Sequence, residues 1–277
     1  MSFRDRKRSG DIKGYLIIAI VLAISVAIAS YFFINESKKV KIDKDTFCPK
    51  DQNLNFGKTV ALLDLTDPLN KAQKEFFIKE IEQLKKEIPK HHRLTIYTLD
   101  QELDLSKSRM ITMCNPGSIQ DIESTYEKIS INPNEIRKMW SEGFSEQISN
   151  VVNNIIAAEN PQNTSPVMEM FQLIALNEFK NFKGNSNNII ILSDMIQNTE
   201  TLSMYQNNTL SFIDFRSTEF FSKVQTNLEN NVDVTLFIIK RDGSRKMQEN
   251  KKFYEFWAQY FYNGNKAKNF KLTYVDG

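Results

Sequence analysis

The stretch Thr59-Val-Ala-Leu-Leu-Asp-Leu-Thr-Asp-Pro68 is an apolar run that ends abruptly in oxygen-bearing side chains. Its continuously apolar part is typical of a strand buried on both faces, and such strands occur mainly in parallel sheets covered by helices. Ligands of open α/β sheets bind at the carboxyl ends of the strands, so we expect Asp64, Thr66 and Asp67 at a binding site. Asp67, with the proline after it, also has the pattern of a helix N-cap, and both interpretations stay open.

A second stretch repeats this pattern later in the chain. Residues 188–194, Asn-Ile-Ile-Ile-Leu-Ser-Asp, form another buried run that ends in Ser193 and Asp194. Between the two runs lies a polar loop at residues 160–166, and a helix is expected after it. Ser165 in this loop is either the N-cap of that helix or a ligand-facing hydroxyl, and the local pattern favours the cap.

The rest of the chain alternates between strand and helix patterns. Further strands are expected at residues 94–99, 110–114, 232–239 and 270–275, and helices at residues 68–88, 135–158, 212–228 and 247–262. The last helix carries an aromatic stripe that we expect in the core. This order predicts one α/β domain over residues 58–277, a doubly wound and mostly parallel sheet flanked by helices.

The beginning of the chain predicts a membrane anchor. Residues 14–34 contain no charged side chain and are long enough to cross a bilayer, whereas a signal-peptide core has only about 7–15 residues. A cleaved signal peptide is the alternative. Basic residues precede the segment at 1–13, so we expect a cytoplasmic tail there, a linker at 35–57 and an extracytoplasmic, periplasmic body on the inner membrane.

Cysteine and histidine usage bears on the compartment. The chain has two cysteines, Cys48 and Cys114, and an even pair in an exported domain predicts a disulfide. Two unrelated thiols are the alternative. The two histidines, His91 and His92, are adjacent, which we interpret as an exposed turn before a strand and not as part of a zinc site.

The two strand ends resemble the von Willebrand factor A domain, a doubly wound fold with a metal-ion-dependent adhesion site at the carboxyl end of its sheet. The resemblance begins near residue 58 and runs to the end. The family's Asp-x-Ser-x-Ser motif falls on Asp64, Thr66 and Pro68. Its Thr-Pro loop falls on Ser165 and Pro166, and its late Ser-Asp pair on Ser193 and Asp194. Pro68 departs from the pattern because it has no hydroxyl.

The resemblance implies a ligand set for Mg²⁺ or another divalent cation, and a surface for a protein partner. The implied metal ligands are Asp64, Thr66, Ser165 and Asp194, with Asp67 as a replacement for the oxygen lost at Pro68. The implied partner-binding residues are Asp67, Thr164 and Ser193. A degenerate fold without metal is the alternative.

Three classes of function follow from these patterns. The leading one is a membrane-anchored protein-interaction module that is not an enzyme and belongs to a membrane-associated assembly. The alternatives are a metal-assisted hydrolase of the same fold and an inert structural subunit. A hydrolase lacks an evident general base, because neither histidine falls in a site loop. The formal charge of +2 gives no electrostatic argument for nucleic acid.

Overall fold

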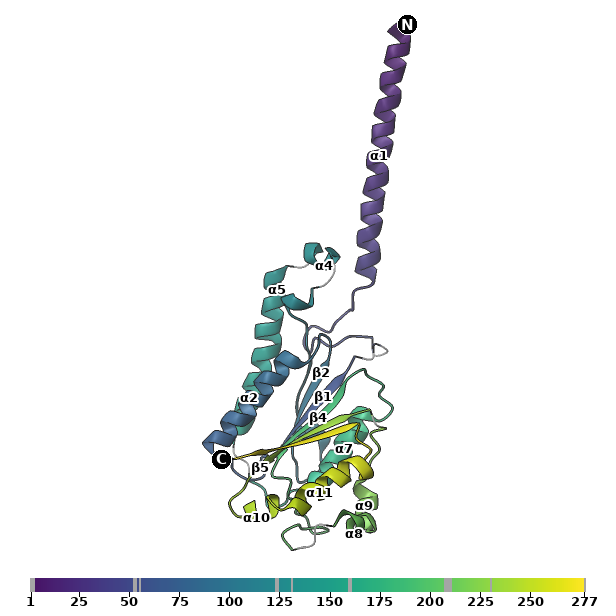
Figure 1. The fold of residues 1–277 in the computed structure, drawn as a ribbon. Coiled ribbons are helices and arrows are strands. Elements are labelled where there is room, and N and C mark those ends of the chain that lie inside the picture. The colour runs from purple at the N-terminus through teal and green to yellow at the C-terminus, as the bar shows by residue number, and fades with distance from the viewer. Residues whose placement is uncertain are drawn as a thin grey trace. The chain divides into compact units, whose positions relative to one another are not determined.

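The computed structural model describes residues 3–51, 54, 56–122, 125–130, 132–158, 161–206, 211–229 and 231–276. The side chains of residues 3–13, including the basic cluster before the anchor, lie outside the described residues, as do Asn160 of the expected loop and residues 52, 53 and 55 of the expected linker. The chain divides into two compact units (Figure 1). One comprises Met1–Lys41 and Ile122–Ile131, and the other Ile42–Asp121 and Asn132–Gly277.

The smaller unit holds the expected anchor. Helix α1 (Phe3–Ser37) contains, at Gly14–Ser37, the one described helix that is long and apolar enough to cross a membrane, with a mean hydropathy of 2.7. Near its end it meets the short helix α4 (Thr125–Ser130), where the Tyr126 ring lies 5.4 Å from the Phe32 ring and its hydroxyl donates to Glu36. This contact joins the segment 122–131 to the end of the apolar helix.

The larger unit is built on one sheet. Its six described strands are β1 (Lys58–Leu63), β2 (Arg93–Thr98), β3 (Arg109–Cys114), β4 (Asn187–Ser193), β5 (Asp233–Ile239) and β6 (Asn269–Val275). Their order is β3-β2-β1-β4-β5-β6, and every neighbouring pair is parallel except β2 and β3. This order changes direction between β1 and β4, the point at which doubly wound sheets bind ligands. The predicted fold class is confirmed.

Helices cover both faces of this sheet. The described helices of the larger unit are α2 (Lys71–Glu87), α3 (Leu105–Ser108), α5 (Pro133–Lys138), α6 (Gln147–Ala158), α7 (Val167–Phe179), α8 (Phe212–Arg216), α9 (Glu219–Val224), α10 (Arg245–Gln248) and α11 (Lys251–Gln259), with a 3₁₀ turn η1 (Ile119–Asp121) and π-helical segments η2 (Met139–Glu146) and η3 (Tyr260–Gly264). Segments α5, η2 and α6 follow one another without a break, as expected for 135–158.

Strand β1 shows why two layers are needed. Side chains of a strand alternate between its faces, and β1 is buried on both. Val60 and Leu62 pack on one side with residues of α7, α9 and α11, whereas Ala61 and Leu63 pack on the other with residues of α2 and α6 (Figure 1). The aromatic stripe is confirmed as core: its members Phe253, Phe256, Trp257, Tyr260 and Phe261 are all buried.

Several boundaries differ from the sequence-based expectations. Helix α2 is capped by Asn70, not by Asp67: the Asn70 side chain accepts from the Gln73 backbone, and the Gln73 side chain accepts from the Asn70 backbone. The expected helix at 212–228 is two helices, because the Thr218 side chain caps a new one. Asn250 likewise interrupts the helix expected at 247–262.

The two cysteines form the predicted disulfide. Cys48 and Cys114 are bridged across 66 residues of sequence, with their Cα atoms 4.7 Å apart. Cys114 is the last residue of β3 and pairs with Arg93, the first of β2. The bridge therefore lies at the amino end of the parallel strands.

Candidate functional site

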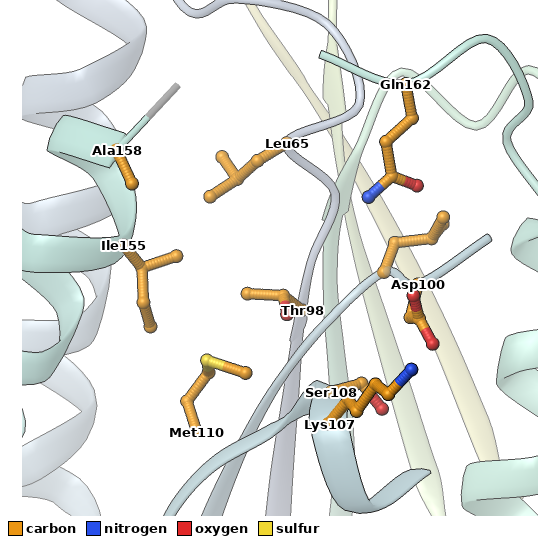
Figure 2. Close-up of a pocket in the computed structure, with 10 residues that line it drawn as sticks. Leu65, Thr98, Asp100, Lys107, Ser108, Met110, Ile155, Ala158 and Gln162 are labelled. Carbon is orange, nitrogen blue, oxygen red and sulfur yellow. The ribbon is translucent and has the colours of Figure 1, made fainter. Parts of the chain in front are cut away.

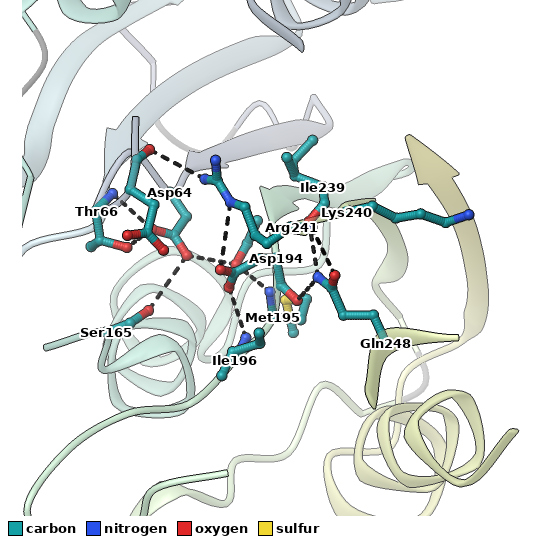
Figure 3. Close-up of polar contacts among 12 residues, drawn as sticks. Asp64, Thr66, Ser165, Asp194, Met195, Ile196, Ile239, Lys240, Arg241 and Gln248 are labelled. Atoms are coloured by element: carbon teal, nitrogen blue, oxygen red, sulfur yellow. Dashed lines mark hydrogen bonds and ion pairs between the residues drawn. The ribbon is translucent and has the colours of Figure 1, made fainter. Parts of the chain in front are cut away.

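Three neighbouring strands bring charged residues to the carboxyl edge of the sheet. Asp64 directly follows β1, Asp194 directly follows β4, and Arg241 lies two residues beyond the end of β5. Strands β1, β4 and β5 lie side by side and parallel, so their ends meet at one edge. Figure 3 shows the three side chains converging there. Asp64 and Asp194 are 3% and 4% exposed, so both carboxylates are buried.

Protein donors surround the Asp64 carboxylate. Its Oδ1 accepts from the backbone N–H of Thr66 at 3.1 Å and from the Thr66 hydroxyl at 2.7 Å. Its Oδ2 accepts from the Ser193 hydroxyl at 2.6 Å, and the Ser165 hydroxyl lies 3.5 Å away. Three of the expected site residues therefore meet at one carboxylate. Figure 3 labels two of them, Thr66 and Ser165, beside Asp64.

Asp194 has fewer donors. Its Oδ1 accepts from the backbone N–H of Ile196 at 2.9 Å, and its Oδ2 lies 3.7 Å from Nε of Arg241. Burial raises the pKa of the Asp194 carboxyl above its usual range, and the nearby charge of Asp64 raises it further. The Ile196 N–H and the Arg241 charge act in the opposite direction. The raised pKa favours the protonated form of Asp194, because the one neighbouring cation, Arg241, does not fully balance two buried carboxyl groups.

Arg241 is the main site residue that the sequence-based reasoning missed. Its Nη1 donates to the carbonyl of Pro68 at 2.6 Å and its Nη2 to the carbonyl of Asp67 at 3.2 Å. The guanidinium therefore spans from Asp194 to the loop between β1 and α2. The sequence did carry a signal, because Arg241 follows a buried strand at its carboxyl end, as Asp64 and Asp194 do.

A buried glutamine holds the ends of β4 and β5 together. The Gln248 side chain, which is 0% exposed, accepts from the backbone N–H of Arg241 at 2.9 Å. Its amide donates to the carbonyls of Asp194 at 3.0 Å and of Ile239 at 2.9 Å. These bonds of the Gln248 side chain all go to backbone groups, so they fix the backbone of Arg241 relative to that of Asp194 (Figure 3).

The remaining expected residues take different places. Ser165 is not the cap of α7: the N-cap position is Pro166, without a side-chain bond, and Gln197 from the loop after β4 accepts from the N–H of Met168 instead. Ser193 is 0% exposed, so its hydroxyl supports the site from inside. Thr164 is half-buried and the Asp67 residue is exposed, so these two remain accessible at the edge.

The donor set meets only part of the needs of the implied divalent cation. Mg²⁺ takes oxygen ligands in octahedral geometry, and Asp64, Asp194 and the hydroxyls are oxygens of the right kind. However, Pro68 contributes no side-chain oxygen, and the hydroxyls of Thr66 and Ser193 are directed at Asp64. With a guanidinium beside Asp194, the site fits an ordered charge pair better than a divalent cation.

A recess of about 320 Å³ opens beside the site (Figure 2). It borders the loops after β1 and β2, and its lining is largely apolar near Leu65 and polar near Asp100 and Lys107. The other lining residues are Thr98, Leu99, Ser108, Met110, Ile155, Ala158 and Gln162. The backbone N–H of Gln162 donates to the carbonyl of Thr66 at 2.9 Å, so one loop connects the recess to the charged site.

His92 corrects the interpretation of the adjacent histidines as an exposed turn. It is 2% exposed, and its Nε2 lies 2.8 Å from the Thr59 hydroxyl at the beginning of β1. Burial lowers the pKa of His92 to about 4, so the ring is neutral at pH 7. It belongs to the amino edge of the sheet, at the other end of β1 from Asp64.

No family model and no curated protein sequence matches this chain. Solved structures that are similar to it include the VWA domain of SpRpn10 (9% identity, 80% of this chain and 88% of that chain, TM-score 0.38). A second is BatB from Bacteroides thetaiotaomicron (12% identity, 79% of this chain and 90% of that chain, TM-score 0.35). A third is an aerotolerance-related membrane protein from Bacteroides fragilis that carries multiple mutations to serines (12% identity, 79% of this chain and 92% of that chain, TM-score 0.34). The overlap is loose in each case, so the doubly wound fold of this chain is established by its own strand order and directions.

Proposed function

We propose that this protein is a membrane-anchored interaction module whose body binds a protein partner through the carboxyl-end face of its sheet. The observation that carries the proposal is the convergence of Asp64, Asp194 and Arg241 at the point where the strand order changes direction. Ligands of doubly wound folds bind at this point. The carboxyl edge retains a buried charge cluster that the fold alone does not require.

The surroundings of the cluster also favour a protein partner. The adjoining recess has an apolar side and a polar side, which suits a partner side chain better than a fully charged ligand. Asp67 is exposed and Thr164 is half-buried, so both are accessible. Under this proposal they contact the partner, while Ser193 and Gln248 hold the charged residues from below.

We infer that the site does not catalyse a reaction. Hydrolysis needs a general base or an activated water, and the described residues at this edge include no histidine. His92 is hydrogen-bonded to Thr59 at the amino edge. The test is turnover of generic phosphoesters and peptides by the purified chain with and without Mg²⁺. Turnover that Asp64→Ala abolishes would favour the hydrolase instead.

Partner binding is tested by photocrosslinking in native membranes. A photoreactive residue placed at Asp67 or Thr164 should capture a specific protein, whereas the same residue at the exposed Gln120 should not. Gln120 is a matched control because it lies in η1, which follows the end of β3. That end of β3 pairs with the beginning of β2, so it belongs to the amino edge of the sheet and not to the carboxyl edge. Equal capture from Gln120, or capture from no position, would contradict binding at the carboxyl edge and favour an inert structural subunit.

We further propose that α1 anchors the protein in the inner membrane with the body outside the cytoplasm. The support is the apolar span Gly14–Ser37, the basic residues before it and the disulfide, which persists in oxidising compartments. Protease added to spheroplasts should digest the body and leave the segment around α1. A body that survives while a periplasmic control protein is cut would contradict this orientation.

A further inference from the structure

Arg241 lies at the candidate site, although the family resemblance implies no role for an arginine there. We propose that its guanidinium is a built-in cation that takes the place of a divalent metal at the carboxyl edge of the sheet. The inference concerns the counter-charge of the site and does not depend on whether a partner binds there.

Arg241 connects the two parts of the chain that a metal ion would connect. One end of the guanidinium faces the carboxylate of Asp194 at 3.7 Å, and the other donates to two carbonyls of the loop between β1 and α2. This loop carries Asp64, Thr66 and Pro68, the residues on which the metal motif falls. A metal ion at such a site would likewise join the loop after β1 to the acidic residue after β4. Arg241 makes this connection with its own side chain.

Arg241 also contacts Pro68, the position at which the motif departs from its pattern. A hydroxyl at this position would supply a ligand, and proline has none. Its carbonyl oxygen instead accepts from Nη1 of Arg241 at 2.6 Å, the shortest of the three guanidinium contacts. Residue 68 is therefore tied to the site through its backbone and Arg241, although its side chain supplies no ligand. A planar guanidinium with several fixed donors can hold two carbonyls and a carboxylate at once, which a lysine cannot do as well.

Contacts within the protein hold Arg241 in place without a ligand. Its side chain is only 16% exposed, and its backbone N–H is bonded to the buried Gln248. Its Nε is buried and has no hydrogen-bond partner among the described residues, and it faces the Asp194 carboxylate at 3.7 Å. A divalent cation bound between Asp64 and Asp194 would have to share this space with a fixed positive charge.

The test uses thermal melts of the full chain in detergent, with chelator and with excess Mg²⁺ or Mn²⁺. For the wild type, a metal that does not bind should leave the melting temperature within about 1 °C. Arg241→Gln leaves two buried carboxylates without their cation and should lower the melting temperature by roughly 5–10 °C. Mg²⁺ should then recover part of this loss, because the variant has no competing positive charge.

Arg245→Gln is the matched control. Arg245 pairs with the exposed acidic groups of Asp242, Glu249 and Asp276 and not with Asp194. Its loss should change the melting temperature by less than about 2 °C and create no response to metal. A double variant, Asp194→Asn with Arg241→Gln, removes both charges and should recover at least half of the loss seen with Arg241→Gln alone.

Two results would overturn the proposal. One is a wild-type melt that rises with Mg²⁺ and loses this response in Asp64→Ala, which would show that a metal occupies the site beside Arg241. The other is an Arg241→Gln variant that melts like the wild type. If Arg241→Gln does not fold, the wild-type metal titration and the double variant still decide the question.

Discussion

The two edges of the sheet both bury polar side chains, but they satisfy them differently. At the amino edge, the neutral His92 ring and the Thr59 hydroxyl form a pair at 2.8 Å, and the Cys48–Cys114 bridge ties the lead-in segment to β3. Gly57 permits close packing there, since a Cβ at this residue would lie 2.1 Å from the Ser186 carbonyl. At the carboxyl edge, Asp64 and Asp194 place two buried carboxylates beside a single cation.

This difference separates a structural use of polar groups from a functional one. Paired neutral groups add specificity to a closed edge at little electrostatic cost. Like charges that are buried together destabilise the fold, and such arrangements occur mainly at sites that bind or react. We therefore expect changes at the amino edge to act on stability alone. Changes at the carboxyl edge should act on stability and on binding.

The largest effect is expected from the disulfide at the amino edge. Replacing both Cys48 and Cys114 by serine should lower the free energy of unfolding by about 4 kcal/mol, because the bridge closes a loop of 66 residues in the unfolded chain. Urea denaturation of the wild type and the double variant measures this. Crosslinking from Asp67 should be retained under conditions where the variant is folded.

The same bridge can be checked without mutation. Thiol labelling of the denatured, unreduced protein should find no reactive thiol, and reduction should reveal two. Two reactive thiols before reduction would show that Cys48 and Cys114 are not bridged, and the amino edge would then lack the disulfide described above.

The next effect is a pH dependence that originates at His92. Burial lowers the pKa of His92 to about 4, below its usual 6.5, so the unfolded chain binds a proton that the folded chain excludes between these values. The stabilising contribution is fully present above pH 6.5 and is lost as the pH falls towards 4, by about 3 kcal/mol in total. Urea denaturation at pH 7.5 and at pH 4.5 should show this loss.

His92→Gln is the comparison for this prediction. Glutamine keeps hydrogen-bonding groups near Thr59 but does not titrate, so the variant should lose about 2 kcal/mol less than the wild type between pH 7.5 and pH 4.5. Parallel losses in both proteins would mean that the amino edge is not the source of the pH dependence.

A smaller effect distinguishes two hydroxyls at the carboxyl edge. Ser193 donates to Asp64 at 2.6 Å and accepts from the N–H of Met195 at 2.7 Å, so Ser193→Ala should cost about 1–3 kcal/mol. The Ser165 hydroxyl lies 3.5 Å from the same carboxylate, at the limit of a hydrogen bond, and Ser165→Ala should cost less than about 0.5 kcal/mol. Chemical denaturation of both variants makes the comparison. Equal losses would contradict the assignment of Ser193 as the inner support of the site.

The smallest effect concerns the start of α2, next to the carboxyl edge. Asn70→Ala removes one half of a capping box and should cost about 1 kcal/mol. Asp67→Ala should change the free energy of unfolding by less than about 0.5 kcal/mol, because the Arg241 contact uses the Asp67 backbone carbonyl. If Asp67→Ala costs more than Asn70→Ala, the helix begins where the sequence pattern first suggested.

Local patterns were sufficient for the framework. The apolar runs before Asp64 and Asp194 predicted two buried strands, and the spacing of the others predicted a doubly wound sheet. The uncharged residues 14–34 predicted the candidate membrane span, and the even cysteine count predicted the disulfide. These features depend on which neighbouring residues are apolar, and that information is present along the chain.

Local patterns were misleading where the tertiary structure supplies a hydrogen-bond partner other than the one that the local sequence suggested. Asp67 and Ser165 have the chemistry of N-caps, but Asn70 caps α2, and Gln197 from another loop serves the first turn of α7. His92 has the pattern of an exposed turn, yet the Thr59 hydroxyl accommodates it in the interior. For the two caps the sequence offered a plausible residue and the packing selected another, and for His92 the packing changed its environment.

The sequence by itself thus determined the strands, their acidic ends and the apolar helix, since each follows from residues adjacent in the chain. Only the tertiary structure decided that Arg241, 47 residues after Asp194 and 177 after Asp64 by their numbers, reaches both Asp194 and the loop that begins at Asp64. The reason is the strand order: β5 pairs with β4 and β4 with β1, so three ends that are remote in sequence share one edge. A charge balance between such ends is a property of that pairing, and no local segment encodes it.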